Sequence, residues 1–151
     1  MSISYADAMT FLPSARRLLP LFAALALTPA AGAAAVWAGA DLNTGGYGVH
    51  AGVALLPIPF IGSFGVEAGA ERGYNAGNAA FSAALTLRDL NLPLTAVDAF
   101  ATAGAEFSDA ARLYAEAGLR GPLLGPAGWR LHVRARQDGM LSGGAGVELR
   151  F

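Results

Sequence analysis

Two histidines have the widest chemical repertoire in this cysteine-free chain of 151 residues. His50 and His132 could each act as a general base or bind a metal ion. Four serines could supply a nucleophile, namely Ser63, Ser82, Ser108 and Ser142. No motif links a serine to either histidine, and a metal site would need further ligands. The sequence therefore predicts no catalytic, metal or cofactor site, and no enzymatic activity.

The elements around these residues are predicted by an alternation of period two. In the C-terminal segment, one parity is apolar: Ala145, Val147, Leu149 and Phe151. The other parity is small or charged: Gly144, Gly146, Glu148 and Arg150. Successive side chains of a strand point to opposite faces, so this pattern indicates a strand with one apolar and one polar face.

Eight segments from Val36 onward follow this rule: 36–42, 47–55, 64–71, 81–88, 98–107, 112–120, 129–136 and 143–151. Within them every charged residue falls on the polar face, together with both histidines and many glycines. A helical period would place apolar residues at i, i+3 and i+4, which does not reproduce this distribution. The sequence predicts an all-β fold, an eight-stranded antiparallel up-and-down barrel.

The polar face predicts a network of ion pairs and hydrogen bonds inside the barrel. Its expected members are Asp41, His50, Glu67, Glu71, Arg88, Glu106, Glu116, Arg120, Arg130, His132, Arg134, Arg136, Glu148 and Arg150. A charge removed from water needs a partner, and the planar guanidinium of arginine pairs well with carboxylates. We expect both histidines to join this network. An eight-stranded barrel is just filled by its side chains, so the lumen is predicted to be non-conducting.

The predicted connections between strands alternate in length. Four are short and polar: 43–46, 73–78, 108–111 and 137–142. Three are longer and contain proline: 56–63, 89–97 and 121–128.

The N-terminal region resembles a secretory signal peptide. Arg16 and Arg17 precede an apolar run at 18–27, and small residues follow at 28–35. A retained transmembrane helix is the alternative, but Pro20, Pro29 and a short apolar core argue against it. The expected organisation is a cleaved signal peptide at 1–35 and a barrel domain at 36–151.

Composition narrows the classes of partner. The net charge is −1, without a basic patch, so nucleic acid is not expected as a partner. An apolar fraction of 54% is too high for a disordered chain, and the absence of cysteine excludes a disulfide framework.

Aromatic residues cluster where the predicted strands end. One group is Trp37, Phe64, Trp129 and Phe151, and the other is Tyr47, Tyr74, Phe81, Phe107 and Tyr114. By parity, Trp37 and Tyr114 point inward. Two girdles of aromatic residues are typical of the two interfaces of a membrane. They favour a transmembrane barrel with its apolar face in lipid.

With the terminal Phe151 and the alternation before it, the chain resembles the small bacterial outer-membrane β-barrels of the OmpA and OmpX type. The resemblance implies a monomer in outer-membrane lipid. It also implies that Val147, Leu149 and Phe151 are the signal read by the barrel-assembly machinery. A structural role in the cell envelope would follow. The family usually has short periplasmic turns and long extracellular loops, whereas the predicted connections have the reverse order.

Two other functions remain open at this level. A soluble periplasmic carrier like the lipocalins would turn the apolar face inward around a small ligand. A membrane-embedded lipid-modifying enzyme would use one of the histidines.

Cleavage of the signal peptide is directly testable. Mass spectrometry of the protein purified from envelopes should give an N-terminus between Ala34 and Val36, because signal peptidase cuts after small residues. Recovery of a chain that still carries residues 18–27 would contradict cleavage.

Overall fold

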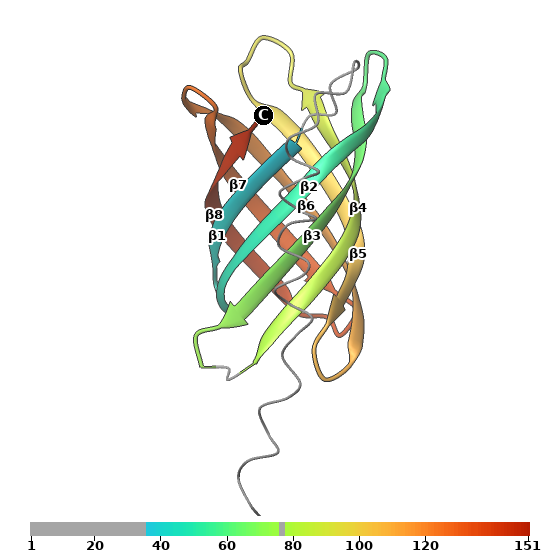
Figure 1. Ribbon diagram of the computed structural model, residues 1–151, viewed down its shortest axis with the longest axis vertical. Coiled ribbons are helices and arrows are strands. Elements are labelled where there is room, and N and C mark those ends of the chain that lie inside the picture. Colours follow the sequence, from blue (N-terminus) through green and yellow to red (C-terminus); the bar gives the residue numbers. More distant parts are fainter. Residues whose placement is uncertain (1–35, 76–77) are drawn as a thin grey trace, which may run out of the picture. The chain divides into compact units, whose positions relative to one another are not determined.

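The computed structural model describes residues 36–75 and 78–151, which form a closed barrel (Figure 1). The strands are β1 (Val36–Asn43), β2 (Gly46–Ile58), β3 (Gly62–Gly73), β4 (Ala79–Asn91), β5 (Asp98–Phe107), β6 (Ala111–Leu124), β7 (Ala127–Arg136) and β8 (Leu141–Arg150). Each strand pairs antiparallel with the next, and β8 closes the barrel by pairing with β1. The predicted all-β, eight-stranded up-and-down barrel is confirmed.

The predicted signal peptide at 1–35 lies outside the described residues. Within the described part of the chain, no helix is long and apolar enough to cross a membrane.

The connections between strands divide between two ends of the barrel. The termini end carries Val36 and Phe151 together with the turns at 59–61, 92–97 and 125–126 (Figure 1). The polar-turn end carries the connections at 44–45, 74–78, 108–110 and 137–140.

The prediction of three long connections at the termini end was wrong. β2 and β3 extend until three residues remain between them, β6 and β7 leave two, and only 92–97 is a six-residue loop. Pro57 and Pro122 lie within strands beside β-bulges, where the missing N–H of proline is tolerated. The expected reversal of loop lengths relative to outer-membrane barrels therefore disappears.

Three β-bulges occur toward the termini end of β2, β4 and β6. They lie between Ala54 and Leu56, between Leu87 and Leu90, and between Pro122 and Leu124. A bulge inserts one unpaired residue and changes which face the following side chains occupy. In β4 the inserted residue, Asp89, has a φ of 58°. Its carboxylate accepts hydrogen bonds from Ser63 and Arg120.

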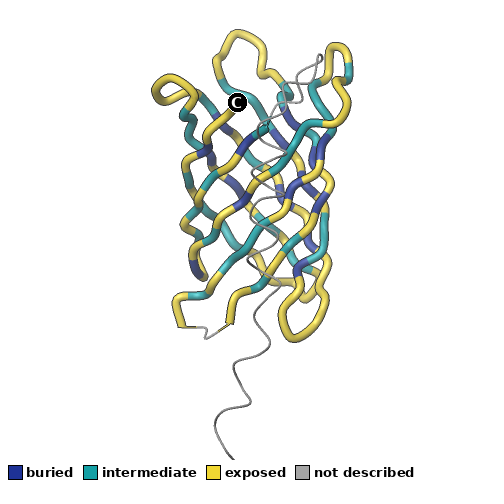
Figure 2. The backbone as a smooth tube through the Cα atoms, viewed as in Figure 1, coloured by how far each residue is buried: buried dark blue, intermediate teal, exposed yellow. Residues whose placement is uncertain are grey.

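Burial alternates along every strand (Figure 2). The described residues include only four buried hydrophobic side chains: Trp37, Ala84, Phe100 and Tyr114. The buried polar and charged residues number eleven, and the large apolar residues are mostly exposed. This distribution is the inverse of that in a water-soluble domain.

Glycines on the inner face make room for the largest inward side chains. Trp37 lies across from Gly52 in the β1–β2 ladder, and a Cβ on Gly52 would lie 2.3 Å from the indole. Phe100 lies across from Gly118 in the same way, with a separation of 2.6 Å. These glycines therefore make space in the narrow interior for Trp37 and Phe100, because a Cβ at either position would overlap the ring.

Candidate functional site: the charged interior of the barrel

Several ion pairs join strands that are not neighbours in the sheet. Arg88 on β4 binds Glu148 on β8, and Arg130 on β7 lies 3.4 Å from Glu67 on β3. These strands lie across the closed sheet from each other, so the contacts pass through the interior. The charged face of every strand therefore points inward.

Glu67 and Glu148 are shared by several arginines at the centre of the barrel. Glu67 lies 3.3 Å from Arg88 and also accepts a hydrogen bond of 2.8 Å from the indole of Trp37. Glu148 lies 3.2 Å from Arg120 and 3.8 Å from Arg130. The side chain of Arg130 is only 3% exposed, so its charge is compensated by protein groups and not by water.

Aromatic rings complete the contacts of three arginines. The guanidinium of Arg88 lies 3.7 Å from the ring centroid of Trp37. Arg130 lies over Phe100, and Arg134 lies over Tyr114 at 4.5 Å. Cation–π attraction is larger when the cation is desolvated, so these rings hold each guanidinium in place.

A second cluster lies nearer the polar-turn end. Arg134 lies 2.9 Å from Glu71 and 2.7 Å from Glu116. Arg136 lies 3.1 Å from both Glu71 and Glu106. Two guanidiniums and three carboxylates thus bridge β3, β5, β6 and β7.

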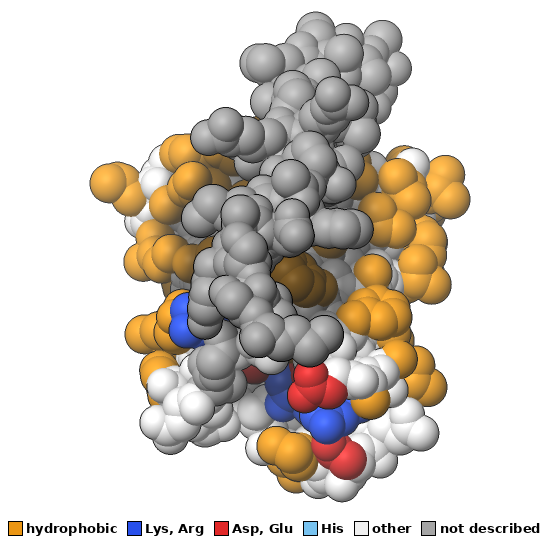
Figure 3. All heavy atoms as spheres, turned by 60° about the horizontal axis from the view of Figure 1, so that its bottom comes forward, with side chains coloured by type: hydrophobic (Ala, Val, Ile, Leu, Met, Phe, Trp, Pro, Cys, Tyr) orange, Lys and Arg blue, Asp and Glu red, His pale blue; other side chains and the backbone are white. Residues whose placement is uncertain are grey.

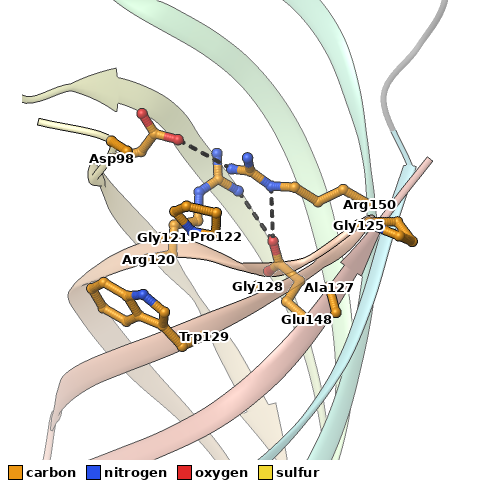
Figure 4. A pocket seen from close by; sticks show the side chains of 12 residues that line it. Asp98, Arg120, Gly121, Pro122, Gly125, Ala127, Gly128, Trp129, Glu148 and Arg150 are labelled. Atoms are coloured by element: carbon orange, nitrogen blue, oxygen red, sulfur yellow. Dashed lines mark hydrogen bonds and ion pairs between the residues drawn. The ribbon is translucent and has the colours of Figure 1, made fainter.

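A third cluster lies at the termini end and includes a residue that the sequence analysis missed. Arg150 lies 3.4 Å from each of Asp89, Asp98 and Glu148. Asp98, Glu148 and Arg150 line a hollow of about 280 Å³ together with Arg120 and residues of the β6–β7 turn (Figure 4). The sequence predicts Asp89 in the connection at 89–97. Nothing in the alternation indicates the bulge that turns this residue inward.

The histidines lie between the first two clusters and share one carboxylate. His50 Nδ1 is 2.7 Å from Asp41 Oδ2, and His50 Nε2 is 2.8 Å from Arg130 Nη1. Arginine can only donate, so its hydrogen bond to Nε2 requires the tautomer in which Nε2 accepts and Nδ1–H donates to Asp41. The same Nε2 also lies 3.5 Å from Glu148 Oε2. His132 Nδ1 is 3.8 Å from Asp41 Oδ1, which is too long for a hydrogen bond.

Several inner hydroxyl groups bond to partners other than the histidines, whereas Ser82 lines the same recess as His50 and His132. Ser63 donates to Asp89, and Ser142 accepts from Arg136 at 3.4 Å. Thr102 donates to Thr86 at 3.0 Å. Within residues 36–75 and 78–151, no group of three or more histidine, aspartate or glutamate residues could hold a metal ion. Most polar side chains of this interior are therefore held by ion pairs and hydrogen bonds to one another.

The structure brings the expected members of the polar network together. All fourteen take part in at least one ion-pair contact. Parity also placed Trp37 and Tyr114 inward, where they pack on arginines.

Comparisons with known proteins reveal similarity in fold. No protein-family model matches the chain, and no curated protein matches it. Among solved structures, a barrel from work described as de novo design of transmembrane β-barrels matches with a TM-score of 0.57. The identity is 12%, and the match covers 78% of this chain and 93% of the designed one. At this identity the likeness concerns the barrel fold alone.

Arg130 is the best place to test the interior network, since it contacts Glu67, Glu116 and Glu148. Arg130→Met keeps a long side chain but leaves buried carboxylates undercompensated, which should lower the free energy of unfolding by about 3–5 kcal/mol. Urea titration in detergent micelles, followed by tryptophan fluorescence, would measure the loss.

Arg112→Met is the matched control, because Arg112 is a half-exposed residue that pairs with Asp138 at 3.9 Å. It should cost no more than about 1 kcal/mol. Equal losses in the two variants would contradict a stabilising role for the buried network.

Proposed function

We propose that this chain is an integral β-barrel protein of a bacterial outer membrane, with a structural role in the envelope and no catalytic activity. The observation that carries the proposal is the inversion of apolar and charged residues. We define the apolar belt as the large outward-facing side chains of the strands: Leu42, Val49, Val66, Leu85, Leu113, Leu119, Leu131, Val133, Val147 and Leu149.

The exposed side chains of the apolar belt would be unfavourable in water and are stable in an apolar environment. These residues lie on every strand except β5. The outward positions 99, 101, 103 and 105 of β5 are alanine, and Phe107 at the end of the strand is exposed. Figure 3 shows hydrophobic side chains along the flanks and charged ones gathered at the polar-turn end. Soluble monomers rarely expose contiguous apolar patches above a few hundred Å². Lipid removes this surface from water, and the closed sheet leaves no unpaired edge in the bilayer.

The interior supports a non-conducting lumen. Three clusters of ion pairs follow one another from the termini end to the polar-turn end, and each joins opposite walls. Trp37, Phe100 and Tyr114 occupy further space between them. Because the charges are paired and the arginines are held by rings, a solute would have to break several contacts to pass.

The other functions fit this geometry less well. A soluble carrier would need an apolar inner cavity, whereas the inner face here is charged. A lipid-modifying enzyme would need a nucleophile beside a histidine. Instead, His50 contacts Asp41, Arg130 and Glu148, and Ser63 and Ser142 are bonded elsewhere. Ser82 shares a recess with both histidines, but that recess is lined by interior charges and not by the apolar belt.

Export and assembly complete the proposal. A cleaved signal peptide at 1–35 would deliver residues 36–151 to the periplasm. Val147, Leu149 and Phe151 face outward on and after β8, where the barrel-assembly machinery could read them before β8 closes on β1. The barrel would be a monomer surrounded by lipid, with no nucleic-acid partner.

Two leucine substitutions test the lipid-facing assignment. Leu85, near the middle of β4, is 54% exposed, and Leu141, at the first position of β8, is 73% exposed. Leu85→Arg should weaken folding into lipid vesicles by about 2–4 kcal/mol, whereas Leu141→Arg near the interface should cost about 0–1 kcal/mol. Equal tolerance of both arginines in vesicle refolding titrations would contradict a bilayer around the belt, since a barrel in water accepts either.

Removal of the Phe151 side chain tests the assembly signal. Phe151 is largely exposed, so Phe151→Ala should cost well under the roughly 1.5–3 kcal/mol of a fully buried aromatic residue. In cells, however, the variant should accumulate unassembled in the periplasm. Phe60→Ala is the control, as another exposed phenylalanine at the termini end. Normal outer-membrane levels of Phe151→Ala would contradict the assembly role.

A further inference from the structure

The turns at the termini end are apolar to their tips. The runs 55–64, 90–97 and 121–128 contain no charged residue and no histidine. Phe60 and Leu94 are fully exposed, at 109% and 105%, and Leu124 is 84% exposed. Loops that stand in water rarely present three large apolar side chains at their most protruding points.

The backbone conformation of these turns is a second indication that their tips make an apolar contact. Phe60 has a φ of 66° and Leu94 a φ of 65°. The left-handed region favours glycine or asparagine, and a bulky side chain there is uncommon. The turns therefore hold large apolar side chains at positions where a smaller or polar residue would relieve strain.

The connections at the polar-turn end contain charged and polar residues, and of their large apolar side chains Tyr74 and Met140 are exposed. They include Thr44, Gly45, Tyr74 and Asn75. Glycine and asparagine are residues that solvated turns prefer. Asp109 and Asp138 lie in the other two connections, and Arg112 pairs with Asp138 at that end. The turns at the polar-turn end thus suit water, and those at the termini end suit an apolar environment.

The strands are too long for both ends to lie in the hydrocarbon. β2 and β4 have 13 residues each. At about 3.3 Å per residue and a tilt of about 40°, such a strand spans roughly 33 Å, against an apolar band of about 25 Å. At least one end must therefore leave the hydrocarbon, and the composition of the turns indicates which.

We propose that the termini end is sunk into one leaflet, with the tips of turns 59–61, 92–97 and 125–126 at the boundary between acyl chains and headgroups. The polar-turn end projects into water on the other side. This inference rests on the proposed membrane location, because the apolar turns continue the apolar belt. It specifies how deeply the barrel lies in the membrane, and it proposes that lipid surrounds the three tips.

Lipid fits this end better than a protein lid or a second copy does. The apolar tips surround the mouth where Asp89, Asp98 and Arg150 are partly exposed. A protein packed flat across the tips would take these charges out of water without new partners. A headgroup boundary takes up the protruding apolar side chains and leaves the charged mouth hydrated.

The absence of cysteine makes the test straightforward, because single cysteines can be introduced one at a time. Phe60→Cys, Leu94→Cys and Leu124→Cys report on the termini end, and Ser108→Cys and Asp138→Cys are the matched variants at the polar-turn end. Each is labelled with an environment-sensitive fluorophore and refolded into phosphatidylcholine nanodiscs, in which both faces are open to the buffer. Fluorescence is then quenched either by spin-labelled lipid or by aqueous iodide.

Labels at 60, 94 and 124 should be quenched several-fold more by spin-labelled lipid than labels at 108 and 138, with the reverse order for iodide. Iodide quenching that is equal at the two ends would overturn the inference. Protection of the three tips from both quenchers would also overturn it, since it would indicate a protein cover. Leu85→Cys separates the two proposals: without lipid quenching there, the membrane location itself fails, whereas lipid quenching at 85 with solvated tips refutes only the sunken end.

Discussion

The pairing of β1 with β8 is the constraint on which the rest of the structure depends. Once the register from Trp37↔Arg150 to Asn43↔Gly144 closes the sheet, every inward side chain must fit a narrow space that is bounded on all sides. Some large residues enter where the neighbouring strand offers a glycine, as Gly39 does for His50 and Gly144 does for His132. Others, such as Arg120 and Arg130, face each other across one ladder and extend to different partners. Closure thus explains these glycines, and it also removes the water that would otherwise solvate the inner charges.

The exclusion of water decides how the charges are arranged. A buried guanidinium carries five N–H donors. Arg130 places its two terminal nitrogens against Glu67, Glu116 and His50, with an aromatic ring over its face, whereas its Nε has no hydrogen-bond partner. Carboxylates are shared in turn, so the network runs as a chain of alternating charges. Such a core is costly to form and costly to break at any one point, which favours a single register over slipped alternatives.

The alternation of the sequence was sufficient to predict the eight strands and the inward members of the network, because a period of two survives any uncertainty in the strand ends. The register shifts could not be predicted. The bulge between Leu87 and Leu90 turns Asp89 inward through a φ of 58°, and no local pattern in the sequence marks that conformation. The prolines were also misinterpreted: Pro57 and Pro122 indicated loops, but they lie in strands beside bulges.

The same bulges connect the interior to the ends of the barrel. All three lie toward the termini end, where they break strict alternation and let Asp89 join Arg120 and Arg150 at the mouth. Because a bulge leaves a residue unpaired and increases local twist, this end is the less regular part of the ladder. Its turns carry the exposed side chains of Phe60 and Leu94, and its inner surface holds a hollow of about 280 Å³ lined by Asp98, Arg120, Glu148 and Arg150. A surface that is apolar outside and charged at its centre is matched by the boundary of a bilayer, where acyl chains and polar headgroups meet within a few ångströms.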